Sequence, residues 1–119
     1  MTNLEYKAFR KAARLIERNK QRYNFYTARA PTTEQDRACV LGWIGYFLKE
    51  TSSVDANFAT QVAKRLTGKP GAFSWYTFYQ RMDNLVVGEW RENHRLAAKA
   101  LRLYADIYHK KEDKVRKTG

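Results

Sequence analysis

Cysteine, histidine and proline are scarce in this chain of 119 residues, and each scarcity narrows what the protein can be. The single cysteine, Cys39, cannot form an intramolecular disulfide, which favours a reducing compartment. With two histidines and no Cys/His cluster, the sequence predicts no metal site and no cofactor site. The two prolines, Pro31 and Pro70, fall where helical patterns end.

Long apolar segments are also missing. The longest nearly continuous apolar run, residues 38–48, covers eleven residues, whereas a membrane-spanning helix needs about 20. The first residues of the chain contain no apolar signal core and no cleavage site. We therefore expect a cytoplasmic protein in which this run forms a buried helix.

Acidic residues are few compared with basic ones. Lys and Arg number 23 and Asp and Glu 12, which gives a formal net charge of +11. Residues 1–30 hold eight basic and two acidic side chains, residues 31–88 six and five, and residues 89–119 nine and five. Both ends of the chain are therefore basic and the middle is nearly neutral. This distribution favours a polyanionic partner, most often nucleic acid.

The spacing of the apolar residues predicts an all-α fold. We expect helices over about residues 3–24, 32–48, 54–66, 73–86 and, starting near 89 or after 93, up to 111. The expected N-caps of the first three are Asn3, Thr32 or Thr33, and Ser52 or Ser53. Segment 73–79 has strong β propensity, but no partner strand is evident, so we favour a helix. We predict a single-domain bundle of about five helices, residues 1–111, and a charged flexible tail, residues 112–119.

The second of these helices is apolar on nearly every side, so we expect it at the centre of the bundle. Glu34 and Asp36 would lie in its first turn, where the helix dipole favours acidic side chains. Gly42 and Gly45 each cost a helix about 1 kcal/mol relative to alanine. We interpret both glycines as room for the close approach of a neighbouring helix.

A basic stripe on the first helix is the sharpest functional signal. It consists of Lys7, Arg10, Lys11, Arg14 and Arg18, opposite an apolar face. Like charges four residues apart cost an isolated helix a few tenths of a kcal/mol per pair, roughly, so a solvated face usually mixes signs. Phosphate groups would relieve this repulsion. Acidic groups of a partner protein, or elsewhere in the fold, would do the same.

A second basic stripe lies on the last helix, diluted by Glu92 and Asp106. It consists of Arg91, Arg95, Lys99 and Arg102. If the terminal helices lie side by side, the two stripes could merge into one patch, and the second stripe would add secondary contacts to nucleic acid.

Aromatic residues concentrate between 73 and 79, and one helix cannot bury all of them. Core packing is the commoner use of such residues, but exposed aromatics also mark protein interfaces. Stacking on unpaired bases is a further alternative. We predict Trp75, Tyr76 and Tyr79 as interface residues.

Catalytic machinery is poorly represented. Cys39 lies in the apolar run and is expected to be an inert core thiol. Arg102 and His109 match the loose Arg-Xaa(4–6)-His spacing of helical ribonucleases found in toxin–antitoxin systems. The resemblance implies that the arginine would hold the phosphate and the histidine would assist cleavage.

Three short motifs together resemble a family of small helical proteins of unknown function in bacteria and their phages. They are Leu-Ile-Glu at 15–17, Cys-Val-Leu-Gly at 39–42, and Trp-Arg-Glu-Asn at 90–93, before an Ala/Leu-rich helix. The resemblance implies an all-α bundle and gives no activity.

The leading hypothesis is a nucleic-acid-associated accessory protein, of phage origin if the resemblance holds, that binds the phosphate backbone of DNA or RNA without catalysis. The alternatives are a protein-binding module, such as an inhibitor docking on an acidic host or defence-complex partner, and a small helical ribonuclease.

Overall fold

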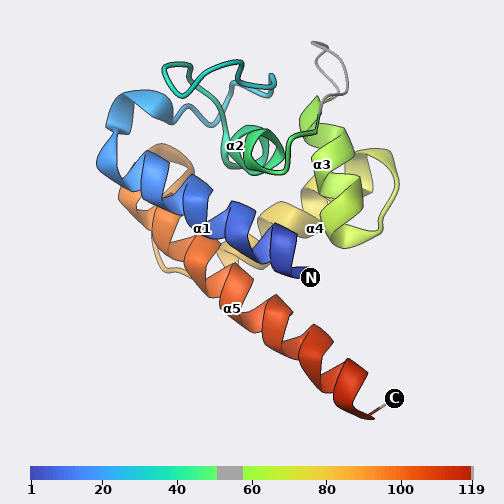
Figure 1. Ribbon diagram of the computed structural model, residues 1–119. Helices are drawn as coiled ribbons and strands as arrows, with labels where there is room; N and C mark the ends of the chain where they lie inside the picture. The colour runs from blue at the N-terminus through green and yellow to red at the C-terminus, as the bar shows by residue number, and fades with distance from the viewer. Residues whose placement is uncertain (51–57, 119) are drawn as a thin grey trace.

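The computed structural model describes residues 1–50 and 58–118, with the side chains of 1–50 and 58–109, and the described chain is all-helical (Figure 1). Its α-helices are α1 (Asn3–Arg18), α2 (Val40–Phe47), α3 (Phe58–Thr67), α4 (Gly71–Asp83) and α5 (His94–Thr118). Two short 3₁₀ turns, η1 (Lys20–Arg22) and η2 (Trp90–Glu92), follow α1 and precede α5. The predicted all-α bundle is confirmed. No described helix is long and apolar enough to cross a membrane.

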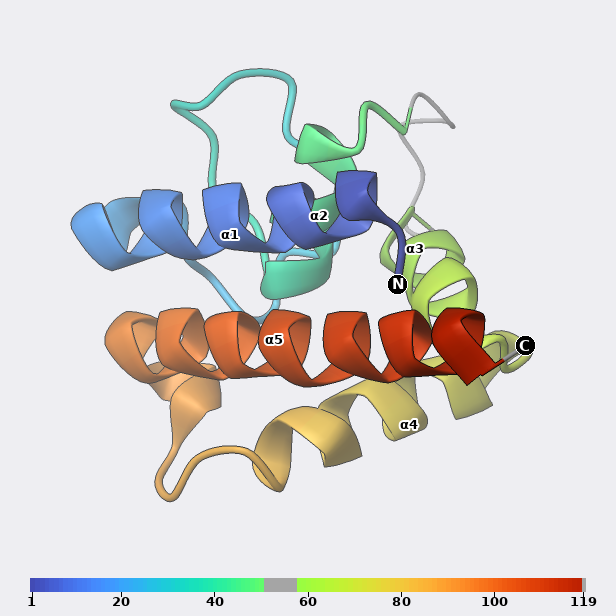
Figure 2. The same cartoon turned by 60° about the horizontal axis from the view of Figure 1, so that its bottom comes forward.

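Helices α1 and α5 run antiparallel and lie side by side along α1, and the C-terminal end of α5 extends past the start of α1 (Figures 1 and 2). At one end, the Tyr6 hydroxyl donates to Asp106 Oδ1 across 3.1 Å. At the other end, His94 Nδ1 lies 2.7 Å from the carbonyl oxygen of Ile16. Helix α2 packs against α1 and α3, and α4 packs against α3 and α5. This arrangement exposes the outer faces of α1 and α5 together.

The central position predicted for the apolar helix is confirmed, since every residue of α2 from Val40 to Gly45 is buried. A Cβ atom at Gly45 would lie 2.8 Å from Val62 Cγ2 and closer still to the Phe58 ring, so α3 occupies that space as expected. At Gly42 the close neighbour is a loop instead, because an added Cβ would lie 2.9 Å from the Arg29 carbonyl oxygen.

The first helix differs from its predicted bounds at both ends. Thr2, and not Asn3, is the N-cap: its hydroxyl accepts from Glu5 N–H at 3.1 Å, and Glu5 Oε1 accepts from Thr2 N–H at 2.8 Å. This reciprocal pair is a capping box. The helix ends at Arg18 and not near Asn24, because Asn19 adopts an extended conformation with φ of −133°.

The predicted helical start at Thr32 or Thr33 is wrong, because the segment before α2 forms a turn. Asp36 Oδ2 accepts hydrogen bonds from the Thr32 backbone at 2.7 Å, the Thr32 hydroxyl at 2.9 Å and the Thr33 backbone at 3.2 Å. An aspartate that binds nearby backbone donors in this way competes with helix formation. Helix α2 consequently begins only at Val40, with Cys39 at its N-cap position.

The remaining helices agree with expectation in type and differ in their ends. The caps predicted at Ser52 or Ser53 lie outside the described residues. Segment 73–79 is helical, within α4, and the β alternative is absent there. Helix α5 begins at His94 and continues to Thr118, past the end expected at Lys111. Lysine, arginine and glutamate make up most of residues 112–118. All three have a high intrinsic helix propensity.

Candidate nucleic-acid interface

The basic stripe predicted on α1 is present as an exposed face. All five of its side chains are exposed: Lys7, Arg10, Lys11, Arg14 and Arg18. The opposite face is buried in the core through Phe9, Ala12 and Ile16. The burial of the apolar face fixes the rotation of the helix, and this rotation turns the cations outward.

The stripe on α5 joins the stripe on α1. Arg102 lines a shallow hollow of about 270 Å³ together with Lys7, Arg10, Lys11 and Arg14. Arg95 and Lys99 are exposed on the two preceding turns of α5. We call the joined patch the basic surface, defined as Lys7, Arg10, Lys11, Arg14, Arg18, Arg95, Lys99 and Arg102.

A second hollow extends this patch along α1. It has a volume of about 450 Å³ and is lined by Lys11, Arg14 and Arg18 with Leu15, Asn19, Glu34 and Phe47. Glu34 makes no ion pair within the described residues and adds one negative charge at the border of the basic surface.

Glu17 of α1 lies in the seam between the two helices, as does Asp106 of α5, which binds Tyr6. Arg102 binds Glu17 through two hydrogen bonds, Nη1 to Oε2 at 2.6 Å and Nη2 to Oε1 at 3.1 Å. These bonds, together with the positive charges of Arg18 and Arg95, lower the pKa of Glu17. Glu17 therefore stays ionised at neutral pH and offsets the charge of Arg102 on the α5 side of the basic surface.

The cations of α1 are not neutralised in this way. Within the described part of the chain, none of Lys7, Lys11, Arg14 and Arg18 forms an ion pair. Arg10 packs over the Tyr6 ring, with its Cζ 5.7 Å from the ring centre, and donates to the Tyr6 hydroxyl at 3.4 Å. Within the described residues, the like-charge repulsion along α1 is consequently relieved by no ion pair at these four cations, and only the longer-range attraction of Glu17 for Arg18 and the nearby Glu34 offset it in part.

Arg91 is separated from the other predicted contacts. It lies in η2 and not in α5, so the helical spacing that groups Arg95, Lys99 and Arg102 does not reach it. Its Nη2 binds Asp83 Oδ2 at 3.3 Å, and its guanidinium covers the rings of Phe25 and Tyr79. The structure therefore places Arg91 away from both hollows of the basic surface.

Of the three predicted interface aromatics, only Tyr76 is exposed, at 66% of its surface. The indole N–H of Trp75 donates to Thr60 Oγ1 at 2.7 Å. Tyr79 packs among Phe25, Trp75 and Trp90, and its hydroxyl is buried. The sequence prediction missed Phe73, which is 69% exposed one turn before Tyr76.

The residues considered for catalysis are held by contacts within the protein. Burial raises the pKa of the Cys39 thiol, which is completely enclosed. Arg102 is bound to Glu17, and the His109 ring stacks on Tyr6 with 4.5 Å between ring centres. A ribonuclease mechanism would have to release both side chains from these contacts, so the geometry adds no support to it.

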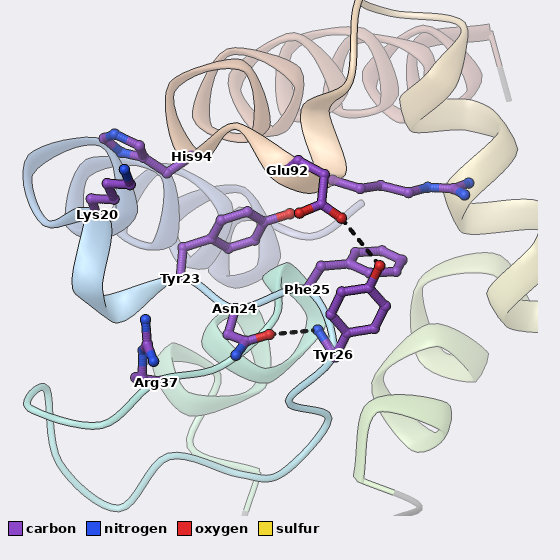
Figure 3. A pocket seen from close by; sticks show the side chains of 9 residues that line it. Lys20, Tyr23, Asn24, Phe25, Tyr26, Arg37, Glu92 and His94 are labelled. Carbon is purple, nitrogen blue, oxygen red and sulfur yellow. Dashed lines mark hydrogen bonds between the residues drawn. The ribbon is translucent and has the colours of Figure 1, made fainter.

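A polar hollow at the far end of α1 was missed by the sequence prediction (Figure 3). Its volume is about 300 Å³, and its lining includes Lys20, Asn24, Tyr26, Arg37 and Glu92. We call it the Tyr26 pocket. Its residues come from η1, from irregular segments, from η2 and from the first residue of α5, so no helical or strand periodicity could have grouped them.

Comparison with known proteins does not identify a relative: no family profile, curated protein or solved structure matches the chain. The resemblance based on residues 15–17, 39–42 and 90–93 stays a prediction. The function is therefore argued from the surface itself.

Proposed function

We propose that the protein is a nucleic-acid-associated accessory protein that binds the phosphate backbone of DNA or RNA without catalysing a reaction. The observation that carries the proposal is the basic surface, where four exposed cations of α1 and the half-buried Arg102 of α5 line one hollow. A cytoplasmic location and a phage origin belong to this proposal as well.

The energetic argument rests on α1. The pairs Lys7–Lys11, Arg10–Arg14 and Arg14–Arg18 each cost a few tenths of a kcal/mol, roughly, in an isolated helix. Within the described residues, no ion pair offsets this cost at Lys7, Lys11, Arg14 or Arg18. A polyanion would replace the repulsion with attraction and would release its condensed counterions.

The expected binding mode follows from the kind of groups on the surface. Lysine and arginine side chains on a shallow face reach phosphates, and phosphate contacts carry no sequence information. Lys7, Arg10, Lys11, Arg14 and Arg18 would provide the main contacts, with Arg95, Lys99 and Arg102 secondary. Binding should therefore be nearly independent of sequence and fall steeply with salt.

The test is a fluorescence-anisotropy titration of labelled DNA and RNA at several salt concentrations. The variant Lys11→Glu/Arg14→Glu should bind about 100-fold more weakly at 0.1 M salt, because each lost phosphate contact is worth about eightfold there. The control Lys64→Glu/Lys69→Glu makes the same change of net charge at exposed lysines outside the basic surface and should keep nearly full affinity.

Two results would overturn the proposal. One is no binding of the unmodified protein at low salt. The other is an equal loss of affinity in the two double variants, which would mean that net charge alone drives association.

Protein binding remains the second candidate, and the exposed pair Phe73 and Tyr76 on α4 favours it. A stoichiometric partner that survives nuclease treatment, and is lost in the variant Phe73→Ser/Tyr76→Ser, would support this alternative.

A further inference from the structure

The Tyr26 pocket contains an aromatic ring that is exposed and yet fixed. The ring is 77% exposed. The Tyr26 backbone N–H donates to Asn24 Oδ1 at 2.9 Å, and its hydroxyl donates to Glu92 Oε1 at 3.1 Å. The Phe25 ring meets it edge-on with 5.2 Å between centres. Exposed tyrosines lose rotamer freedom when a ligand stacks on them, and these contacts have already removed much of that freedom.

The opposite side of the same pocket is cationic. Lys20 and Arg37 are exposed, and Figure 3 shows both across the pocket from Tyr26 and Glu92. Arg37 Nε donates to the Gln21 carbonyl at 2.9 Å, which orients the guanidinium and leaves both terminal nitrogens without a bond in the described residues. Arg91 also lines the pocket, on the Tyr26 side, where its guanidinium is paired with Asp83. The pocket therefore has an aromatic side next to Glu92 and an opposite side where Lys20 and Arg37 attract anions.

The pocket adjoins one end of the basic surface. Lys20 follows Arg18 of α1 after a single residue, Asn19, which itself lines the second hollow. His94 at the pocket rim contacts the Ile16 carbonyl, and its neighbour Arg95 acts on Glu17. A polyanion lying on the basic surface thus reaches Lys20, the first residue of η1, just past the C-terminal end of α1.

We propose that the Tyr26 pocket binds one unpaired nucleotide of a single strand whose backbone continues onto the basic surface. The base stacks on the Tyr26 ring, and the adjoining phosphate binds Lys20 and Arg37, away from the repelling carboxylate of Glu92. This inference rests on the proposed function and narrows its ligand class. A duplex cannot use the pocket, because its base faces are already stacked on one another.

The test compares a labelled single-stranded 12-mer with the duplex of the same sequence. The unmodified protein should bind the single strand several-fold more tightly. Tyr26→Ala should weaken single-strand binding about 5- to 100-fold, the usual cost of losing one base–aromatic stack. Duplex binding should not change. Tyr26→Phe keeps the ring and should keep most of the affinity.

Tyr76→Ala is the matched control, because it removes a similarly exposed tyrosine from α4, outside both the pocket and the basic surface. It should leave both affinities unchanged, and circular dichroism checks that each variant is folded. Adenosine monophosphate, tested as a competitor, should displace the strand only at far higher concentration than an unlabelled strand.

The outcomes separate this inference from the proposed function. If both forms of DNA bind but Tyr26→Ala weakens neither, or weakens both equally, the pocket assignment is wrong and the proposed function stands. If the mononucleotide competes as well as the strand, the pocket serves a free nucleotide and the strand assignment is wrong. If neither form binds at low salt, the proposed function fails and this inference with it.

Discussion

The cationic faces of α1 and α5 come from the same kind of sequence pattern, but folding leaves them with different amounts of available charge. On α1, Lys7, Lys11, Arg14 and Arg18 have no ion pair among the described residues. Across the seam, Arg102 is bound by Glu17, and only Arg95 and Lys99 of that stripe are without an ion pair among the described residues. A count of charges along a helix therefore measures potential contacts, and only the tertiary structure shows which of them remain available.

Reversing two charges on one helix or on the other should give the largest change in nucleic-acid affinity and tests this comparison directly. Arg95→Glu/Lys99→Glu alters the net charge by the same amount as Lys11→Glu/Arg14→Glu. It does so on α5, where Glu17 already offsets part of the positive charge. We expect a loss of about tenfold in affinity for the α5 variant against about 100-fold for the α1 variant, measured by anisotropy at 0.1 M salt. Equal losses would show that both helices contact phosphates to the same extent.

Removing the seam carboxylate should sharpen the same comparison. Glu17→Gln releases Arg102 and removes a negative charge, so affinity for nucleic acid should rise by about tenfold, the worth of one added phosphate contact. Glu34→Gln is the control, because it removes one charge beside the basic surface without freeing an arginine. If both variants raise affinity by the same factor, the release of Arg102 contributes nothing.

How far the sequence predicted this site depended on whether a residue sits inside a regular helix. The α1 stripe was located correctly because a buried apolar face fixes the rotation of the helix. Arg91 was misplaced because the helical spacing was extended past the start of α5 at His94. The pairing of Arg102 with Glu17 joins positions far apart in the chain, so no local pattern contained it.

The fold, like the site, was predicted correctly inside regular helices and incorrectly outside them. Helix types were predicted correctly from apolar spacing, including the helix over 73–79. The segment before α2 was not, because one side chain, Asp36, redirects the backbone into a turn. The Tyr26 pocket could not be predicted either, since η1, residues 23–26, Arg37, η2 and the start of α5 meet there only in the folded chain.

The position of Arg91 gives a finer test of the comparison. Arg14→Ala should reduce the slope of log affinity against log salt by about one, the signature of a lost phosphate contact. Arg91→Ala should leave the slope for duplex binding unchanged, because its guanidinium binds Asp83 and covers Phe25 and Tyr79, and a duplex does not enter the Tyr26 pocket that Arg91 also lines. A reduced slope for Arg91→Ala would show that Arg91 contacts a phosphate and belongs to the nucleic-acid interface after all.

The smallest expected effect concerns stability and not binding. It is the difference in unfolding free energy between variants of the two carboxylates of α1, Glu5 and Glu17. Burial alone would raise the pKa of Glu5, but hydrogen bonds from Thr2 and Arg65 outweigh it and hold the pKa below its ordinary value of 4.5. A lowered folded-state pKa means that ionised Glu5 stabilises the native state above pH 4.5. This contribution is lost as the pH falls through the folded-state pKa.

Glu5→Gln should therefore lower the free energy of unfolding by about 1–2 kcal/mol at pH 7, through the weakened capping box and the lost pair with Arg65. The difference between variant and unmodified protein should shrink in acid, below the pH at which Glu5 itself is protonated. Glu17→Gln should have a smaller effect at every pH, because its pair with Arg102 is exposed and exposed pairs contribute little. Urea unfolding at several pH values measures both. A Glu17→Gln loss as large as that of Glu5→Gln would mean that the seam pair holds α1 to α5, and Glu17 would then serve the fold as well as the charge of the surface.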